Sequence, residues 1–312
     1  MRVTVTGATG LIGRRVVAAL LRREDTVTVL SRDPERARAE LKRAVANAAP
    51  ADSPAAIGWD PSEEPAPRAA LEGADAVVHL AGENVAQRWS DSAKRKIRES
   101  RVLGTRNLVR GIEALADADR PKALVSGSAI GYYGAHGDEP IDEETAPGKD
   151  FLAQTCAAWE AEADAAARLG VRVVKVRTGV VLDSAGGALG KMLPPFKLGV
   201  GGPVASGRQY ISWIHADDVV GIVSAAIDDE RWQGTINATA PEPQRNRDFS
   251  KALGRALHRP SLLPVPGVAL RLMYGDMARV VTEGARVLPA KALVLGYEFR
   301  HPQLDEALRA AL

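Results

Sequence analysis

The sequence predicts an α/β fold in which a doubly wound parallel sheet is joined to a smaller C-terminal α/β lobe. Short apolar segments alternate with amphipathic helical segments through the first half of the 312 residues. This alternation is typical of a parallel sheet with right-handed crossovers. After about residue 180 the composition shifts to closely spaced glycines and prolines. We therefore expect a first unit over residues 1–180 and the lobe over residues 181–312, a division that allows some later segments to return to the first sheet.

The expected strands of the first unit are short apolar runs bounded by turn residues. They are Arg2–Thr6, Thr26–Leu30, Ala56–Trp59, Ala76–Leu80, Ala123–Ser126 and Val171–Val176. The expected helices between them are Leu11–Arg23, Pro34–Ala46, Ala93–Leu115 and Phe151–Leu169. Asp33 before Pro34 is a favourable helix start. The segment Ala44–Pro67 is rich in alanine, proline and charge, and we expect it to form a loose surface connection.

The lobe begins with a stretch whose composition is that of a long functional loop, from Gly186 to about Trp213. Further on we expect an extended segment at Pro260–Pro266. The helices expected there are Asp248–His258, Val268–Ala285 and one that starts at Gln303.

Composition places the chain among ordinary globular proteins. Hydrophobic residues make up 46% and charged residues 26% of it, enough for a full core. A net charge of +2 and 4% aromatic residues do not favour nucleic acid as a partner. The single cysteine excludes an intramolecular disulfide and a multi-cysteine metal site. No apolar run is long enough to span a membrane, and no signal peptide precedes the first strand, so we expect a cytoplasmic protein without a membrane partner.

Three glycines near the N-terminus carry the strongest functional signal. Gly7, Gly10 and Gly13 follow the first strand and precede an amphipathic helix. Glycines permit a tight turn and the close approach of a pyrophosphate, and the helix start offers free N–H groups and a positive dipole end. The alternative is an ordinary glycine-rich turn. The strand and helix on either side favour a dinucleotide-binding Rossmann unit.

The end of the second strand indicates which nicotinamide cofactor is bound. An Asp or Glu at this position usually contacts the adenosine ribose of NAD. Here Ser31 and Arg32 follow the strand, and an arginine can pair with the 2′-phosphate of NADP. Asp33 competes for a ribose contact, but its place before Pro34 makes helix capping the better explanation. We therefore expect NADP(H) as the cofactor.

Four motifs lie in the first half of the chain: Thr6–Gly13, His79–Gly82, Arg101–Thr105 and Ser126–Gly134. They resemble those of the extended or atypical short-chain dehydrogenase/reductases, the sugar-nucleotide epimerase group. Later motifs resemble an "epimerase family" subgroup with a distinctive C-terminal domain, some members of which carry a label linking them to cell-division inhibition. The later motifs are Arg177–Leu182, Pro195-Phe196, Gly201–Pro203, Ser212–His215 with Asp217-Asp218, and Gly296–Phe299.

The resemblance and the glycine motif together imply a set of cofactor-binding residues. They are Gly7, Thr9, Gly10, Leu11, Ile12, Gly13, Ser31, Arg32, Leu80, Ala81, Gly82, Arg101 and Ser126. Arg101 occupies the helix position where related epimerases place a polar residue near the pyrophosphate, although a surface arginine on a basic helix is the alternative. His79 lies in an apolar run, and we expect a hydrogen-bonded core histidine rather than a base.

Reductases of this group use a Ser, a Tyr and a Lys four residues after the Tyr. Ser128 matches the Ser position, but Leu152 and Cys156 stand at the Tyr and Lys positions, so the usual proton relay is absent. Tyr132 is a replacement candidate, and core packing is an equally good explanation of it. We expect Cys156 to be a buried structural thiol.

Further replacement candidates are Tyr133, His136, Lys191, Gln209, Tyr210 and His215. No metal site is expected, because Asp217 and Asp218 are better explained as helix caps. Two functions stay open. One is an oxidoreductase or epimerase-like enzyme whose pocket lies between Ser128–Tyr133 and Gly186–His215. The other is a non-catalytic NADP(H)-binding sensor or interaction protein. Neither the substrate nor the oligomeric state follows from the sequence.

Overall fold

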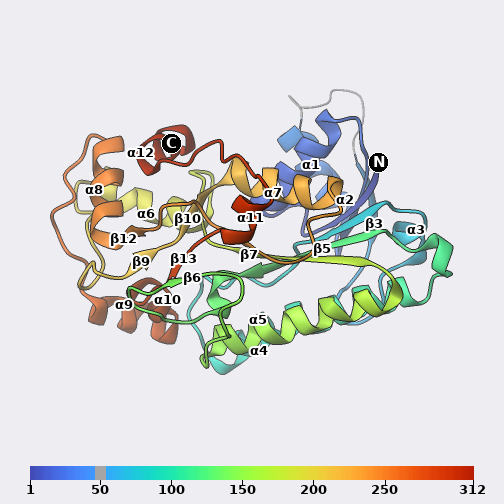
Figure 1. The fold of residues 1–312 in the computed structure, drawn as a ribbon. Helices are drawn as coiled ribbons and strands as arrows, with labels where there is room; N and C mark the ends of the chain where they lie inside the picture. The colour runs from blue at the N-terminus through green and yellow to red at the C-terminus, as the bar shows by residue number, and fades with distance from the viewer. Residues whose placement is uncertain (46–53) are drawn as a thin grey trace.

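The computed structural model describes residues 1–45 and 54–312. Its centre is a parallel sheet of seven strands. They are β1 (Arg2–Thr6), β2 (Thr26–Ser31), β3 (Ala55–Gly58), β4 (Ala76–His79), β5 (Ala123–Ala129), β7 (Arg172–Thr178) and β11 (Gly234–Ala238). Their order across the sheet is β11-β7-β5-β4-β1-β2-β3 (Figure 1). The order reverses at β1, and such a switch point is where open α/β sheets bind ligands.

Helices cover both faces of this sheet (Figure 1). On one face lie α1 (Leu11–Arg22), α2 (Pro34–Val45) and α7 (Ala216–Asp228), and on the other lie α3 (Arg68–Leu71), α4 (Asp91–Glu113) and α5 (Phe151–Asp164). Successive strand residues point to opposite faces. Val78 therefore belongs to the core under α1 and α7, whereas Val77 belongs to the core over α4 and α5. The predicted doubly wound parallel sheet is confirmed.

The lobe has its own core, which contains Leu189, Trp213, Phe249 and Leu308. Its elements are β8 (Val180–Leu182), α6 (Gly187–Lys197), β9 (Tyr210–Ile211), β10 (Trp213–His215), β12 (Gln244–Arg245), α8 (Asn246–Ala256) and α12 (Leu304–Ala311). β8 pairs with β10 in parallel, and β9 pairs with β12 in antiparallel orientation.

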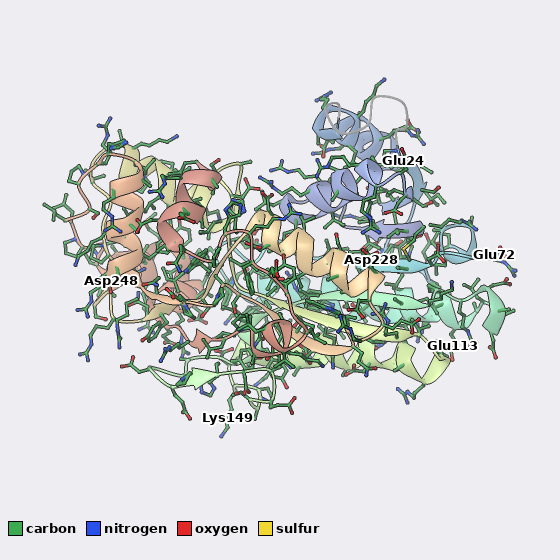
Figure 2. All side chains as sticks on the ribbon, turned by 45° about the horizontal axis from the view of Figure 1, so that its top comes forward. Glu24, Glu72, Glu113, Lys149, Asp228 and Asp248 are labelled. Atoms are coloured by element: carbon green, nitrogen blue, oxygen red, sulfur yellow. The ribbon has the colours of Figure 1, made fainter. Side chains whose placement is uncertain are left out.

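The remaining elements are short. They are η1 (Asp117–Asp119), η2 (Ile130–Tyr132), β6 (Pro140–Ile141), η3 (Ala165–Leu169), α9 (Gly267–Tyr274), η4 (Gly275–Ala278), α10 (Arg279–Thr282), β13 (Arg286–Val287) and α11 (Ala290–Val294). β6 pairs with β13. Side chains fill the space between sheet and helices, while charged residues such as Glu24 and Glu113 lie on the outside (Figure 2). None of the described helices has the length and apolar character needed to cross a bilayer.

The loop predicted after Gly186 is wrong. The stretch is not a long loop throughout, because α6 forms there with Pro194 and Pro195 inside it. Leu189, Leu193 and Phe196 recur at helical spacing and are buried, and this burial outweighs the cost of the prolines.

The single helix predicted over Val268–Ala285 is also wrong, because it is broken into α9, η4 and α10. Gly275 ends α9 with a φ of 62°, in the left-handed region that glycine adopts without strain.

The predicted loose connection Ala44–Pro67 is wrong in its described second half. Residues 46–53, which include the predicted end of the second helix, lie outside the described residues. Beyond them, the predicted strand is present as β3, and Trp59 is 2% exposed. Its indole N–H donates a hydrogen bond to the Glu64 carbonyl at 2.9 Å. The segment is therefore anchored in the core between α3 and α4.

β11 comes from residues beyond the predicted division at residue 180, yet it pairs with β7 along five residues of the central sheet. α7, which precedes it, packs on the same sheet. The chain thus leaves the sheet at β8, builds part of the lobe, and returns to the sheet before completing the lobe, as the sequence analysis allowed.

Candidate functional site

The turn between β1 and α1 needs glycine at two positions for packing. Gly7 has a φ of 68°, and a Cβ there would lie 2.6 Å from the Leu80 carbonyl carbon, at the end of β4. A Cβ on Gly13 would collide with the Gly7 carbonyl oxygen. The glycines therefore let the helix start pack tightly against the turn and against the neighbouring strand.

Gly10 has a different role, because it leaves the start of α1 open. It is the N-cap residue and provides no side-chain hydrogen bond to the helix. Within the described residues, no protein group accepts a hydrogen bond from the N–H groups of Leu11, Ile12 or Gly13. Free N–H groups at the positive end of a helix fit the pyrophosphate of a dinucleotide. The residues present thus fit the cofactor that the sequence predicts.

Ser31 is the last residue of β2, the strand beside β1, and Arg32 and Asp33 follow it. The Asp33 carboxylate accepts a hydrogen bond from the Arg36 backbone N–H at 2.9 Å, which confirms its capping role. Ser31 Oγ accepts from the Asp33 N–H at 3.2 Å. Arg32 is exposed, and its side chain makes no ion pair within 4.0 Å with any described residue. Its guanidinium is therefore available for an anionic ligand.

His79, at the end of β4, is a core histidine as predicted. It is fully buried, and its ring nitrogens lie 2.7 Å from Thr6 Oγ1 and 3.1 Å from Thr105 Oγ1. Burial lowers the pKa of His79 to about 4, so the ring is neutral near pH 7. Thr6 Oγ1 also accepts from the Ala81 N–H at 3.2 Å, so His79 helps to hold the segment Leu80–Gly82 in place.

Ser128 lies near the end of β5 and takes part in a buried charged network. Its hydroxyl donates to Glu160 Oε1 at 2.7 Å. The same carboxylate receives Nε and Nη2 of Arg177, each at 2.8 Å. Burial opposes the charge of Arg177, but its hydrogen bonds to Glu160 and the negative charge of that group outweigh burial and raise the arginine pKa. Ser128 is thus tied to an ion pair, and its catalytic role stays a prediction.

Tyr132 and Tyr133 lie against the same arginine. The Arg177 guanidinium carbon is 3.3 Å from the centre of the Tyr132 ring, and the Tyr132 side chain is half-buried. The Tyr133 hydroxyl donates to Asn237 Oδ1 at 2.7 Å and accepts from Arg177 Nη1 at 2.8 Å. Burial raises the pKa of Tyr133 to about 12. Tyr133 is therefore a structural residue. Tyr132 has no hydroxyl hydrogen bond within the described residues and stays a candidate acid.

Leu152 and Cys156 lie in the first turns of α5. A Cβ on Gly131 would contact Leu152 at 3.3 Å. Cys156 is 4% exposed, and burial raises the pKa of its thiol to about 12, as expected for a structural cysteine. Neither side chain can supply the proton or the positive charge of the usual relay.

Arg101 of α4 is not the surface arginine that one alternative suggested. A Cβ on Gly82 would lie 3.1 Å from the Arg101 guanidinium carbon, which is also 5.3 Å from the centre of the Trp159 ring. Nη1 donates to the carbonyls of Glu83 and Ile97, at 2.9 and 3.1 Å. Burial lowers the pKa of Arg101, which has no carboxylate within 4.0 Å among the described residues. The cation is close enough to Cys156 for each to affect the pKa of the other.

Most of the predicted cofactor residues lie at the same edge of the central sheet. β5, β4, β1 and β2 are consecutive in the sheet, so their carboxyl ends bring Ser126, Gly82, Gly10 and Arg32 to one edge. Ser126 is buried and donates to the Gly127 carbonyl at 3.3 Å.

The lobe lies over this edge. A Cβ on Gly187 would contact Leu11 at 3.0 Å, and Lys191 Nζ donates to the Ala86 carbonyl at 2.5 Å. The start of α6 is thereby placed against the start of α1 and against the loop that follows β4.

The prediction that Asp217 and Asp218 cap α7 is wrong. The N-cap is His215, whose Nδ1 accepts from the Asp217 N–H at 3.1 Å. Asp218 is fully buried, and its carboxylate accepts from the backbone N–H groups of Arg300 and His301. It therefore fastens the segment before α12 to α7.

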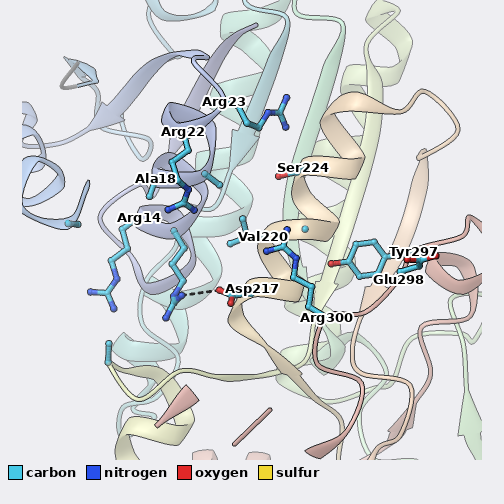
Figure 3. A pocket seen from close by; sticks show the side chains of 15 residues that line it. Arg14, Ala18, Arg22, Arg23, Asp217, Val220, Ser224, Tyr297, Glu298 and Arg300 are labelled. Atoms are coloured by element: carbon cyan, nitrogen blue, oxygen red, sulfur yellow. Dashed lines mark hydrogen bonds and ion pairs between the residues drawn. The ribbon is translucent and has the colours of Figure 1, made fainter. Parts of the chain in front are cut away.

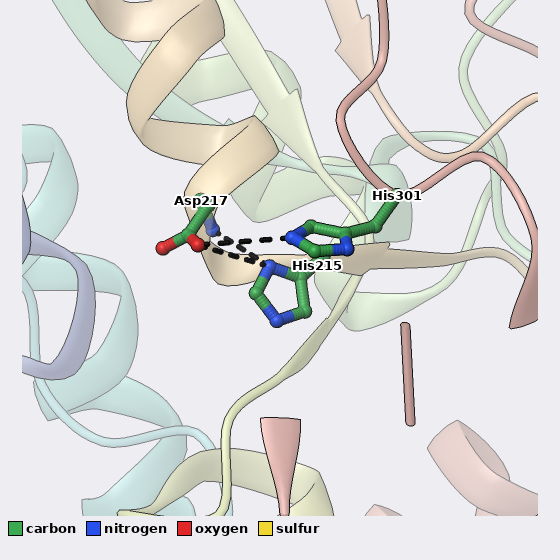
Figure 4. Close-up of side chains that lie close together, drawn as sticks. All are labelled: His215, Asp217 and His301. Atoms are coloured by element: carbon green, nitrogen blue, oxygen red, sulfur yellow. Dashed lines mark hydrogen bonds and ion pairs between the residues drawn. The ribbon is translucent and has the colours of Figure 1, made fainter. Parts of the chain in front are cut away.

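His301, which was not predicted as a site residue, packs against His215 with ring centres 3.9 Å apart and ring planes tilted by 48° (Figure 4). Their nitrogens and the Asp217 carboxylate lie within 4.8 Å of one another. A metal bound at His215 Nδ1 would have to displace the hydrogen bond from the Asp217 N–H. The Asp217 oxygen that faces both rings is Oδ2, whereas Arg15 pairs with Oδ1. Burial is the main cause that lowers the pKa of His215, and the neighbouring His301 is the second, so both favour the neutral ring.

The parallel sheet, its switch point and the open helix start define a dinucleotide-binding α/β protein with an added C-terminal lobe. The chain belongs to the NAD dependent epimerase/dehydratase family, whose model matches residues 3–238. Residues 265–311 match a domain of unknown function, DUF1731. The resemblance of the sequence motifs to the epimerase family is thereby confirmed, and the link to cell-division inhibition stays a prediction.

Relatives match along the whole chain. The chain is 42% identical over 312 residues to the chloroplastic SDR39U1 homolog of Arabidopsis thaliana, covering all of this chain and 87% of that protein. A crystal structure of the human epimerase family protein SDR39U1 with NADPH is 34% identical, with a TM-score of 0.85, over 100% of this chain and 99% of that one. UDP-glucuronic acid 4-epimerase from Bacillus cereus, at 17% identity, 100% and 98% coverage and a TM-score of 0.78, shares the fold.

Proposed function

We propose that the protein is an NADP(H)-binding enzyme of the oxidoreductase or epimerase type that acts on a small molecule. The observation that carries the proposal is the start of α1, where the N–H groups of Leu11, Ile12 and Gly13 have no acceptor within the described residues. A negatively charged pyrophosphate would satisfy them. The human protein of similar fold was crystallised with NADPH, which supports the same cofactor here.

Arg32 provides the preference for NADP(H) over NAD(H). Its exposed guanidinium follows the strand next to the glycine turn, where the adenosine ribose of a dinucleotide lies. Calorimetric titration should give tighter binding of NADPH than of NADH. Arg32→Ser should weaken NADPH binding by about 1.5–3 kcal/mol, as for a hydrogen bond to a charged group, and leave NADH unchanged. Arg38→Ser, on the next helix, is the matched control. Equal affinities of the parent for both cofactors would contradict the assignment.

When bound, the nicotinamide supplies hydride transfer, and the chain must supply the proton and orient the substrate. Arg101 can replace the positive charge of the missing lysine. It reaches the segment Leu80–Gly82 from α4 rather than from α5, and it lies beside Cys156, at the lysine position. Tyr132, whose hydroxyl has no partner within the described residues, is the favoured acid. Ser128, whose own proton is directed to Glu160, would accept a hydrogen bond from a substrate hydroxyl through its lone pairs.

A panel of small carbonyl and hydroxyl compounds, followed by NADPH absorbance, tests the enzyme. Turnover by the parent should fall in Ser128→Ala, Tyr132→Phe and Arg101→Met. Arg101→Lys should keep more of the turnover than Arg101→Met does. Arg98→Met is the control, because Arg98 lies on the same face of α4 but is exposed, and it should leave turnover unchanged. Turnover that persists in all three variants would remove these residues from the mechanism.

One observation favours the second candidate, a non-catalytic NADP(H) sensor. The Ser128 proton is directed to Glu160, and Leu152 cannot transfer a proton. Tight NADPH binding without turnover of any compound in a broad panel would favour this candidate over the enzyme.

A further inference from the structure

A basic groove lies along the outer side of α1 and α7. Its volume is about 850 Å³, and Figure 3 shows its lining. Five arginines line it, against two carboxylates from Asp217 and Glu298. The arginines are Arg14, Arg15, Arg22, Arg23 and Arg300. Its size is within the usual range for small-molecule sites.

Two of the arginines are neutralised by carboxylates. Nε of Arg15 lies 2.7 Å from Oδ2 of Asp183, and Nη2 of Arg23 lies 2.7 Å from Oδ1 of Asp228. These pairs hold the groove together, because they join α1 to the segment before α6 and to the end of α7.

The other three arginines, Arg14, Arg22 and Arg300, make no ion pair within 4.0 Å in the part of the chain that the structure describes. Three like charges that share one groove repel one another, and a guanidinium offers several N–H donors in a planar fork. An anion placed between them would relieve the repulsion and accept those hydrogen bonds.

The floor of the groove is made of small residues. Ala18 and Ala19 of α1 face Val220 and Ser224 of α7, so no long side chain fills the space between the arginines. Gly221 is required there, because a Cβ on it would collide with the Tyr297 hydroxyl. That hydroxyl donates to the Asp218 carbonyl at 3.1 Å, which places the tyrosine at the edge of the groove.

We propose that this groove binds a compact polyanion, one that carries two or more phosphate or carboxylate groups. The site is distinct from the cofactor edge. The groove begins at Arg14, beyond the glycine turn, and runs toward Arg22 at the other end of α1. Neither Gly10 nor Arg32 lines it.

The test is calorimetric titration of the full chain with tripolyphosphate, and separately with citrate, after saturation with NADPH. Saturation fills the cofactor edge, so that binding there does not contribute. We expect one equivalent of polyanion to bind, with an affinity that falls as salt is raised. Arg22→Ser and Arg300→Ser should each weaken binding about tenfold, as for the loss of one charged hydrogen bond. The probe that binds with the higher affinity shows whether phosphate or carboxylate is the preferred group.

Arg309→Ser is the matched control, since Arg309 is exposed on α12 and does not line the groove. It should leave the affinity unchanged. Unchanged urea midpoints would show that the variants are folded. The proposal is overturned if neither probe binds, if NADPH abolishes binding, or if Arg309→Ser weakens binding as much as Arg22→Ser and Arg300→Ser do. Failure of NADPH itself to bind would count against the proposed function alone, and the titration would then report on the groove in the free protein.

Discussion

Separating Arg177 from Glu160 should destabilise the protein strongly. The two side chains are 4% and 6% exposed, and two hydrogen bonds of 2.8 Å join them. Removing one partner leaves the other as an uncompensated buried charge, which costs about 3–5 kcal/mol. Arg177→Met and Glu160→Met should each lower the free energy of unfolding by this amount. The measurement is urea unfolding followed by tryptophan fluorescence and circular dichroism.

The double variant distinguishes a coupled ion pair from two independent packing defects. With both charges gone, neither group is left buried alone. The free energy of unfolding of the double variant should therefore fall by less than the sum of the two single losses, and the difference should be at least about 2 kcal/mol. Arg106→Met is the control, since its pair with Glu162 is partly exposed, at 43% and 21%, and should cost under about 1 kcal/mol. Additive losses in the double variant would refute the reasoning.

Three further predictions follow from buried or tightly packed groups. Because the folded pKa of His79 is about 4, below its ordinary 6.5, the unfolded chain takes up the proton first. The free energy of unfolding should fall by about 3 kcal/mol between pH 6.5 and pH 4, and urea titrations of His79→Asn should lack this part of the pH dependence. Gly13→Ala should cost about 1–3 kcal/mol and weaken NADPH binding, because its Cβ meets the Gly7 carbonyl. Gly58→Ala, whose Cβ would meet only Pro34 at an ordinary contact distance of 4.0 Å, should do neither. Cys156 should react with Ellman's reagent only on unfolding, and fast labelling of the native protein would contradict its burial.

Much of the sheet could be predicted because its signals are local. β1, β2, β4, β5 and β7 are short apolar runs, and each begins within one residue of its predicted start. β11 was missed, because Asn237 is polar and its partners, the Tyr133 hydroxyl and the Leu288 carbonyl, come from distant parts of the chain. α6 was missed because glycine and proline counts hid the spacing of its three buried apolar residues.

The candidate site also has a part that could be predicted from the sequence and a part that could not. The glycine turn is a contiguous motif, so Gly7, Gly10 and Gly13 could be assigned from spacing alone. The surroundings of Arg101 could not, because its depth depends on how α4 packs against Trp159 and the loop after β4. The hydrogen bond from Ser128 to Glu160 joins residues 32 positions apart, and no local pattern signals it.

The position of β11 at the edge of the sheet limits how the protein can be divided or recombined. A fragment that ends at residue 180 would keep six of the seven strands but lose β11 and α7. It would expose the hydrogen-bonding edge of β7 and the apolar side chains of Val174 and Val176, and such an edge promotes aggregation. The lobe is therefore an insertion after β7 together with a C-terminal tail, and it is not a detachable module. Lobes could be exchanged between relatives only if both pieces were exchanged at once, with β11 kept from the host protein.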